Sequence, residues 1–209
     1  REEDIPPTYI SFVFKPSGSI KIWCLSLSAN LSTLVSILGQ YLGPVPLIFP
    51  SCERAESLIL FRRKGCKLLS EKGFTPRLHE IGNLQRNKVK LIIKSVSLIH
   101  SLDTLALARE INKQAERVGR CVPVLIEVNS AREEQKGGVL PEDVERFLLE
   151  VRELPNIAVS GLMTMGPVVD DPELIRPYFR LTRELFERLA STYGFAGDGI
   201  LSMGMSDSY

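Results

Sequence analysis

The stretch that decides the fold is Arg77-Leu-His-Glu-Ile-Gly-Asn-Leu-Gln-Arg-Asn-Lys-Val-Lys90. Its residue pattern predicts a short strand over 78–82, a polar turn and a helix over 84–93. Helical patterns alternate from here with further strands, predicted at 96–100, 123–128, 157–165 and 200–203. Strands that alternate with helices in this way predict a parallel α/β fold. The pattern alone leaves open whether the sheet closes into a barrel or stays open and doubly wound.

Residues 1–66 do not continue this pattern. No charged residue occurs from Ile22 to Cys52, which raises the question of a membrane span. The most apolar window, Leu31–Leu42, is short and rich in serine, so we expect no transmembrane helix. A strand over 8–14 and a helix over 31–41 are the only elements that this part suggests.

Composition narrows the possible partners and the compartment. The net charge of +1 provides no general attraction to nucleic acid or to an anionic membrane. The four cysteines are scattered without a CxxC pair, and the chain has only two histidines, so a zinc site is not expected. Free thiols in a reducing cytosol are the simplest interpretation, and we therefore expect a cytoplasmic protein.

Polar residues follow the predicted strands at their carboxyl ends, where sites lie in parallel α/β folds. Hydroxyls and amides without charge suit an anion such as a phosphate. The same residue types also form turns, so both interpretations stay open. These positions are His79 and Asn83, His100–Asp103, Asn129-Ser130, Thr164–Gly166 and Ser202–Ser206.

Other motifs favour few kinds of chemistry. Neither a GxGxxG nor a Walker sequence follows any strand, and no Ser/His/Asp or Cys/His set is legible. A lone histidine in a strand, such as His79, is more often a hydrogen-bonded core residue than a catalytic one. The charged residues from Arg132 to Glu145 predict a solvated loop and helix face.

Several segments, in order and correctly spaced, resemble one known family, the pyridoxal phosphate homeostasis proteins. His79–Lys88 resembles the family's H-x-I-G-x-L-Q-x-N-K, and Pro123–Asn129 resembles its P-V-L-I-Q-V-N, with Glu127 where the family has glutamine. Further matches are Ile99–Asp103, Lys136–Gly138, Ser160–Met165 and Leu201–Asp207.

The resemblance implies an incomplete (β/α)8 TIM barrel of the alanine racemase N-terminal type that holds pyridoxal 5′-phosphate (PLP) as an imine with a lysine. It also implies a protein that buffers PLP and delivers it to PLP-dependent apoenzymes without turnover. By carry-over, His79 lies near the cofactor, and Ser202, Met203, Gly204 and Ser206 bind it. No catalytic or metal-binding residue is implied, and a monomer is expected.

The sequence also departs from the family. The V-S-K-x motif that carries the family's lysine, the G-E-N segment and the last strand's G-S-T-x-V-R-I-G segment have no match here. Lys15 is the one lysine that follows a strand-like run. We therefore expect a non-family segment over 1–66, frame-shifted or disordered, and a partial, truncated barrel over 67–209. A PLP-dependent racemase and a non-functional fragment without the PLP lysine remain as alternatives.

Overall fold

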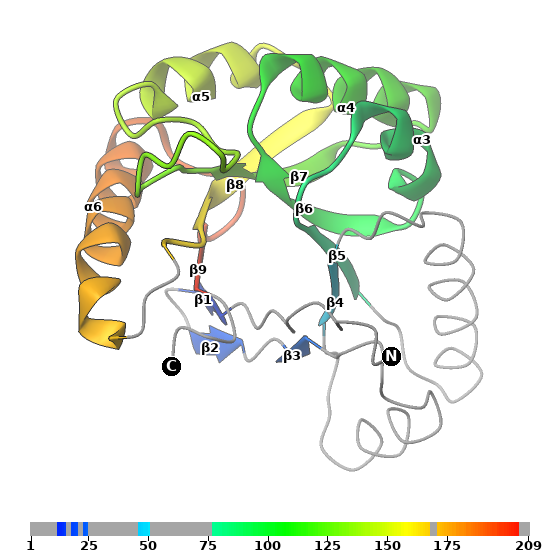
Figure 1. Cartoon of the computed structure of the whole chain (residues 1–209). Coiled ribbons are helices and arrows are strands. Elements are labelled where there is room, and N and C mark those ends of the chain that lie inside the picture. Colours follow the sequence, from blue (N-terminus) through cyan, green and yellow to red (C-terminus); the bar gives the residue numbers. More distant parts are fainter. Residues whose placement is uncertain are drawn as a thin grey trace, which may run out of the picture.

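The computed structural model describes residues 12–15, 18–20, 23–24, 46–50, 77–167 and 171–204. Five consecutive strands lie parallel to their neighbours, which confirms the predicted parallel α/β class. In Figure 1 these strands form a curved wall, and the helices cover its outer side. The strands are β5 (Arg77–Ile81), β6 (Val96–Leu102), β7 (Val122–Glu127), β8 (Ile157–Thr164) and β9 (Ile200–Met203).

Short strands from the first fifty residues extend this sheet at both ends. The strand order is β2-β1-β9-β8-β7-β6-β5-β4-β3. β4 (Pro46–Pro50) pairs in parallel with β5, and β3 (Trp23–Cys24) pairs in parallel with β4. β1 (Phe12–Lys15) instead runs antiparallel to both β9 and β2 (Gly18–Ile20). β1 covers the end of the strand predicted over 8–14, whereas the helix predicted over 31–41 lies outside the described residues.

Helices follow four of the parallel strands, close to the predicted positions. They are the short η1 (Arg86–Lys88) and α3 (Val89–Ile92), then α4 (Leu105–Arg117), α5 (Val144–Arg152), the single turn η2 (Pro172–Leu174) and α6 (Arg176–Tyr193). The last helical region is divided close to Pro177, since η2 ends at Leu174 and α6 begins at Arg176. Pro177 lies in the first turn of α6, where a residue without an N–H costs no helical hydrogen bond.

The sequence predicts Asp103 or Ser101 as the N-cap of α4, since both are capping residue types that follow the strand predicted at 96–100. Ser101 belongs to β6, however, and Thr104 has the extended backbone of a cap. The Thr104 Oγ1 atom accepts a hydrogen bond from the Leu107 N–H at 3.3 Å. The prediction was wrong because β6 continues to Leu102, two residues beyond the predicted strand.

This cap allows a test of how α4 contributes to stability. Thr104→Ala is expected to lower the free energy of unfolding by about 1 kcal/mol, because it leaves the Leu107 N–H without its side-chain acceptor. Urea unfolding followed by circular dichroism measures the change. Thr104→Ser keeps the hydroxyl and should stay close to the parent. An alanine variant as stable as the serine variant would show that the cap is not used.

Among the described residues the core has two parts, one on each face of the sheet. The larger part lies between the sheet and the helices and includes Val124 and Ile126 of β7 and Ile111 of α4. The smaller part gathers Leu98, Leu125 and Met163 on the inner face. β7 is thus buried on both faces, as its continuous apolar sequence predicts.

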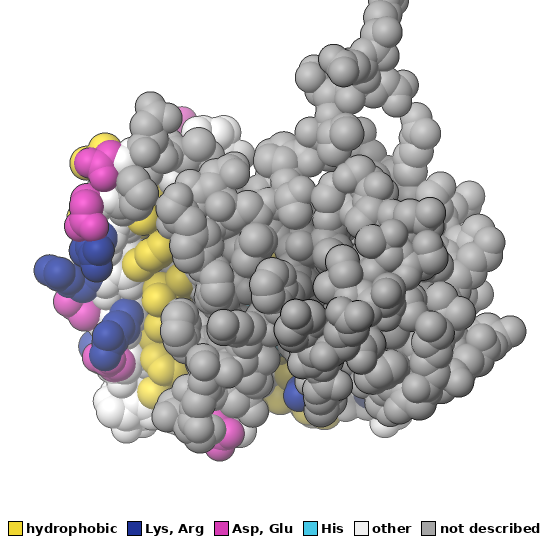
Figure 2. Space-filling model, turned by 90° about the horizontal axis from the view of Figure 1, so that it is seen from below, with side chains coloured by type: hydrophobic (Ala, Val, Ile, Leu, Met, Phe, Trp, Pro, Cys, Tyr) yellow, Lys and Arg dark blue, Asp and Glu magenta, His cyan; other side chains and the backbone are white. Residues whose placement is uncertain are grey.

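Charged side chains mark the outer surface. Figure 2 shows basic and acidic side chains along one outer edge of the molecule, with hydrophobic side chains beside them. On α6, Arg183 and Glu187 pair at 2.8 Å, while Leu185 and Leu189 are buried against the sheet. Among the described residues, no helix is both long enough and apolar enough to cross a membrane.

Candidate functional site

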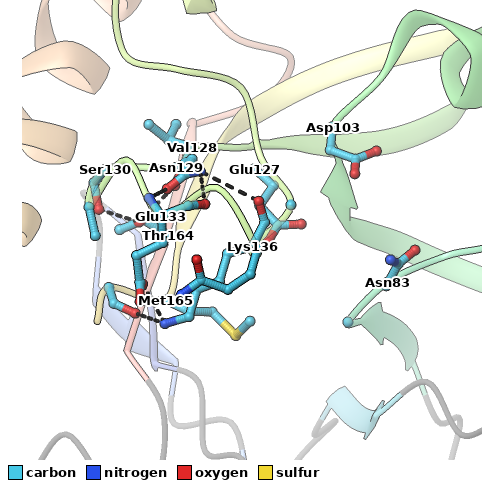
Figure 3. Close-up of a pocket in the computed structure, with 15 residues that line it drawn as sticks. Asn83, Asp103, Glu127, Val128, Asn129, Ser130, Glu133, Lys136, Thr164 and Met165 are labelled. Carbon is cyan, nitrogen blue, oxygen red and sulfur yellow. Dashed lines mark hydrogen bonds and ion pairs between the residues drawn. The ribbon is translucent and has the colours of Figure 1, made fainter. Parts of the chain in front are cut away.

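A pocket of about 310 Å³ opens at the carboxyl ends of β5 to β8, where the strand pattern predicts a site. Figure 3 shows Asn83 and Asp103 on one side, facing the loop after β7 across the open space. Polar residues predicted at the ends of all four strands meet here. The lining residues are Gly82, Asn83, Asp103, Glu127, Val128, Asn129, Ser130, Ala131, Glu133, Gln135, Lys136, Gly137, Thr164, Met165 and Gly166.

The loop after β7 is held in place by its own polar groups. The Asn129 side chain accepts a hydrogen bond from the Glu133 N–H at 3.1 Å and donates one to the Glu133 carbonyl at 2.9 Å. The Lys136 ammonium lies 2.6 Å from a Glu133 carboxylate oxygen and donates to the Gly166 carbonyl at 3.1 Å. The loop therefore connects the end of β7 to the segment that follows β8.

This loop corrects the interpretation of the charged patch as solvated. Glu133 and Lys136 line the pocket, and only part of each side chain reaches solvent. Arg132 and Glu142, which pair at 2.6 Å, do lie on the exposed surface as expected. The Lys136-Gly-Gly138 motif was the one signal in the sequence that singled out this lysine.

Glu127, the last residue of β7, is the acid of the pocket with the strongly raised pKa. Burial raises the pKa of its carboxyl to about 7, and the negative charge of Asp103 adds to the shift. Burial also raises the pKa of Asp103. The polar residues at the carboxyl ends of the strands were expected to be mostly uncharged. The pocket nevertheless carries the ionisable side chains of Asp103, Glu127, Glu133 and Lys136. Near neutral pH, Glu127 therefore exists both as a hydrogen-bond donor and as a carboxylate.

Two hydroxyls join the ends of β7 and β8. Thr164 Oγ1 donates to the Val128 carbonyl at 2.9 Å. The Ser130 and Thr164 hydroxyl oxygens lie 2.8 Å apart, and since the Thr164 proton is already used, Ser130 is the donor. These bonds hold the pocket wall between the two strands.

A second polar group lies on the inner face of the sheet. His79 Nδ1 lies 3.1 Å from His100 Nε2, and His100 Nδ1 lies 3.2 Å from the Ser202 hydroxyl oxygen. All three side chains are buried. Burial, helped by the positive charge of Arg77, lowers the pKa of His79 to about 4. Burial and the neighbouring His79 lower the pKa of His100 well below its usual value, so both rings are neutral at pH 7.

The structure therefore brings together His79 and Ser202, two of the predicted cofactor residues, through a residue that had no assigned role. His100 was placed at a strand end by the sequence, but it lies within β6. Met203 packs against the larger core, and the Gly204 N–H donates to the Thr164 carbonyl at 3.2 Å. Ser206 lies outside the described residues. His79, Ser202, Met203 and Gly204 are not among the residues that line the pocket.

The register of β1 places Lys15 away from the pocket. Phe12 pairs with Met203 and Phe14 with Leu201, so the chain runs toward the amino end of β9 as it approaches Lys15. The pocket lies at the opposite edge, beyond the carboxyl ends of the parallel strands. The backbone position of Lys15 therefore does not suit the role of the family's lysine.

Comparisons with known proteins agree with the family resemblance. The alanine racemase N-terminal domain family matches residues 52–209. A pyridoxal phosphate homeostasis protein from Aquifex aeolicus is 50% identical over 131 residues, which cover 63% of this chain and 57% of that protein. The chain thus spans somewhat more than half the length of this relative. The predicted domain boundary near residue 67 lies outside the described residues and stays a prediction.

Solved structures share the fold. An unknown protein from Bifidobacterium adolescentis is 28% identical, with a TM-score of 0.64 over 71% of this chain and 60% of that chain. PipY from Synechococcus elongatus, solved with PLP bound, is 21% identical, with a TM-score of 0.56 over 77% of this chain and 82% of that chain. Together with the family match, these similarities confirm the predicted incomplete barrel of the alanine racemase N-terminal type.

Proposed function

Because the chain belongs to the alanine racemase N-terminal domain family, we propose that it binds PLP and takes part in intracellular PLP homeostasis without turning over a substrate. The observation that supports this proposal most directly is the buried Ser202 hydroxyl near the carboxyl end of β9, hydrogen-bonded to His100 at 3.2 Å. The Aquifex relative, which is named a pyridoxal phosphate homeostasis protein and is 50% identical in sequence, also supports this proposal.

The residues present fit the phosphate part of PLP. A phosphate needs hydrogen-bond donors, and the Ser202 hydroxyl is one that the fold holds in a buried position. Resemblance adds Ser206 and the backbone around Met203 and Gly204. The pocket at the ends of β5 to β8 is not lined by Ser202, and its volume of about 310 Å³ falls within the range of roughly 300–1,000 Å³ that small-molecule sites occupy.

The aldehyde part of PLP requires a primary amine, since the chemistry that PLP supplies when bound starts from condensation of its aldehyde with an amine. Among the described lysines, Lys136 is the one that lines the pocket. Its ammonium is paired with Glu133, so this amine must lose a proton before it reacts. We propose Lys136 as the attachment point in this chain, in place of Lys15.

Delivery to PLP-dependent apoenzymes, a monomeric state and a cytoplasmic location complete the proposal. They follow from the resemblance to homeostasis proteins. A racemase-like enzyme is the alternative, and it differs from the proposal in one observable, the turnover of an amino acid.

Borohydride trapping tests the proposal. Protein mixed with one equivalent of PLP and then reduced is expected to carry a stable adduct, which peptide mapping finds at Lys136. Lys136→Arg should lose this adduct, whereas Lys113→Arg, a change at an exposed lysine of α4, should keep it. Amino acid racemisation by the PLP-treated protein would favour the enzyme alternative, and absence of any adduct would contradict PLP binding through a lysine.

A further inference from the structure

We propose that His100 is a positioning residue that couples the proton of the Ser202 hydroxyl to the protonation of His79 Nε2, so that these two buried groups change their hydrogen-bonding roles together. The ligand side of this inference rests on the proposed function. The coupling itself depends only on the hydrogen-bond chain from β5 through β6 to β9.

The hydrogen-bond chain from His79 through His100 to Ser202 is well isolated from water. His100 and Ser202 have no exposed surface, and His79 is 7% exposed. Both nitrogens of the His100 ring are within hydrogen-bond distance of a partner, at 3.1 Å and 3.2 Å. At the far end, His79 Nε2 is buried and has no hydrogen-bond partner among the described residues. A buried polar atom without a partner is costly, so it marks a position where a ligand group is expected.

Neutral imidazole has one donor nitrogen and one acceptor nitrogen, which leaves two complete arrangements. In the first, His79 Nδ1–H donates to His100 Nε2, and His100 Nδ1–H donates to the Ser202 oxygen. In the second, the Ser202 hydroxyl donates to His100 Nδ1, and His100 Nε2–H donates to His79 Nδ1. Any mixed arrangement places two donors or two acceptors against each other and loses a buried hydrogen bond.

The two arrangements present opposite chemistry at their ends. In the first, Ser202 accepts from His100, so its proton is directed to an acceptor other than His100, and His79 Nε2 is an acceptor. In the second, the Ser202 proton is used by His100, and His79 Nε2 carries a proton. An anion that accepts a hydrogen bond from Ser202 therefore selects the first arrangement. It follows that a bound phosphate oxygen at Ser202 makes His79 an acceptor, which suits a ligand whose other end presents a donor.

Histidine nitrogen NMR tests the coupling, and the chain has only the two histidines in question. With ¹⁵N-labelled protein in inorganic phosphate, both rings are expected to be protonated at Nδ1. Without phosphate, the two rings are expected to share one tautomer, whichever it is. Rings in different tautomers, or phosphate that binds while both rings carry their proton at Nε2, would overturn the inference.

Variants separate positioning from fold stability. Ser202→Ala is expected to weaken phosphate binding by roughly tenfold or more and to abolish the effect of phosphate on the His79 tautomer. Ser191→Ala, an exposed serine of α6, is the matched control and should behave as the parent. A change of tautomer at only one of the two rings when phosphate is added to the parent protein would also overturn the inference.

This design distinguishes the inference from the proposed function. If both rings follow phosphate but PLP forms no adduct after borohydride treatment, attachment through a lysine fails and the coupling stands. If PLP forms an adduct while the two rings titrate or change tautomer independently, the coupling fails and the proposed function stands.

Discussion

Gly161→Ala is expected to destabilise the protein by about 3–5 kcal/mol, the range of severe core substitutions. Gly161 pairs with Ile200 where β8 meets β9, and its φ of +150° is a conformation that residues with a side chain rarely adopt. An added Cβ would lie 1.8 Å from the Ile200 carbonyl oxygen. Because this neighbour is backbone, relief requires β9 itself to move.

Thermal and urea unfolding measure this effect, with Gly194→Ala as the control. Gly194 also has a positive φ, of +69°, but no atom lies within 4 Å of an added Cβ. Its ψ of 162° puts it in a backbone region that glycine adopts almost alone, so its substitution should cost about 1–3 kcal/mol, the strain of the backbone without a clash. Equal losses in the two variants would show that the contact with Ile200 does not matter.

Gly161→Ala should also disturb the hydrogen bonds that join His79, His100 and Ser202. Ser202 lies two residues after Ile200 in β9, so a displaced β9 carries the Ser202 hydroxyl away from His100. In a folded Gly161→Ala protein, the NMR signals of the two histidine rings are expected to show that the rings no longer change tautomer together. Retained coupling together with lost stability would locate the damage outside β9.

Glu127→Gln is expected to stabilise the protein at and above neutral pH. The folded state holds the carboxyl proton up to a pKa of about 7, whereas the usual value is 4.5. As pH rises from 4.5 to 7, the unfolded chain loses this proton first, so the parent loses stability across this window. An amide does not titrate, and the variant should gain up to about 3 kcal/mol at pH 8 but little below pH 4.5.

Unfolding at pH 5 and at pH 8 checks this prediction. Glu150→Gln, at an exposed position of α5, is the control and should change stability little at either pH. The histidines act in the opposite direction, since the lowered pKa of His79 makes both proteins less stable as pH falls from 6.5 toward 4. Their contribution is common to parent and variant and cancels in the difference. A difference that does not depend on pH would contradict the raised pKa.

The family motif that Pro123–Asn129 resembles has glutamine at the position of Glu127, so an amide of the same shape is expected to fit the end of β7. The carboxyl is the feature peculiar to this chain. Its cost arises from burial beside Asp103, and this cost does not depend on any ligand.

The parallel strands were predictable because each is a local pattern. β7 is an apolar run buried on both faces, and helical periodicity on either side limits its length. The errors lie where a tertiary contact overrides the local signal. β6 extends to Leu102, so Thr104 becomes the cap. The antiparallel pairing of β1 with β9 has no local signal, since pairing depends on which strand lies beside it.

Some features of the pocket were predictable from the sequence, and others depended on tertiary contacts. Its position at the carboxyl ends of β5 to β8 and its asparagines and hydroxyls follow from the order of strands and the turns after them. The inward position of Lys136 depends on Asn129 folding the loop back. The proton affinity of Glu127 depends on burial and on Asp103, a residue on another strand.

By itself, the sequence determined the alternation of strands and helices, the edge at which polar residues gather, and the family motifs around His79 and Ser202. Only the tertiary structure decided that these two residues are joined through His100. In the sheet, β7 and β8 separate β6 from β9, and in a flat sheet three strand spacings would hold them about 14 Å apart. The 3.2 Å contact between His100 and Ser202 exists because the sheet curves and brings distant strands together across its inner face.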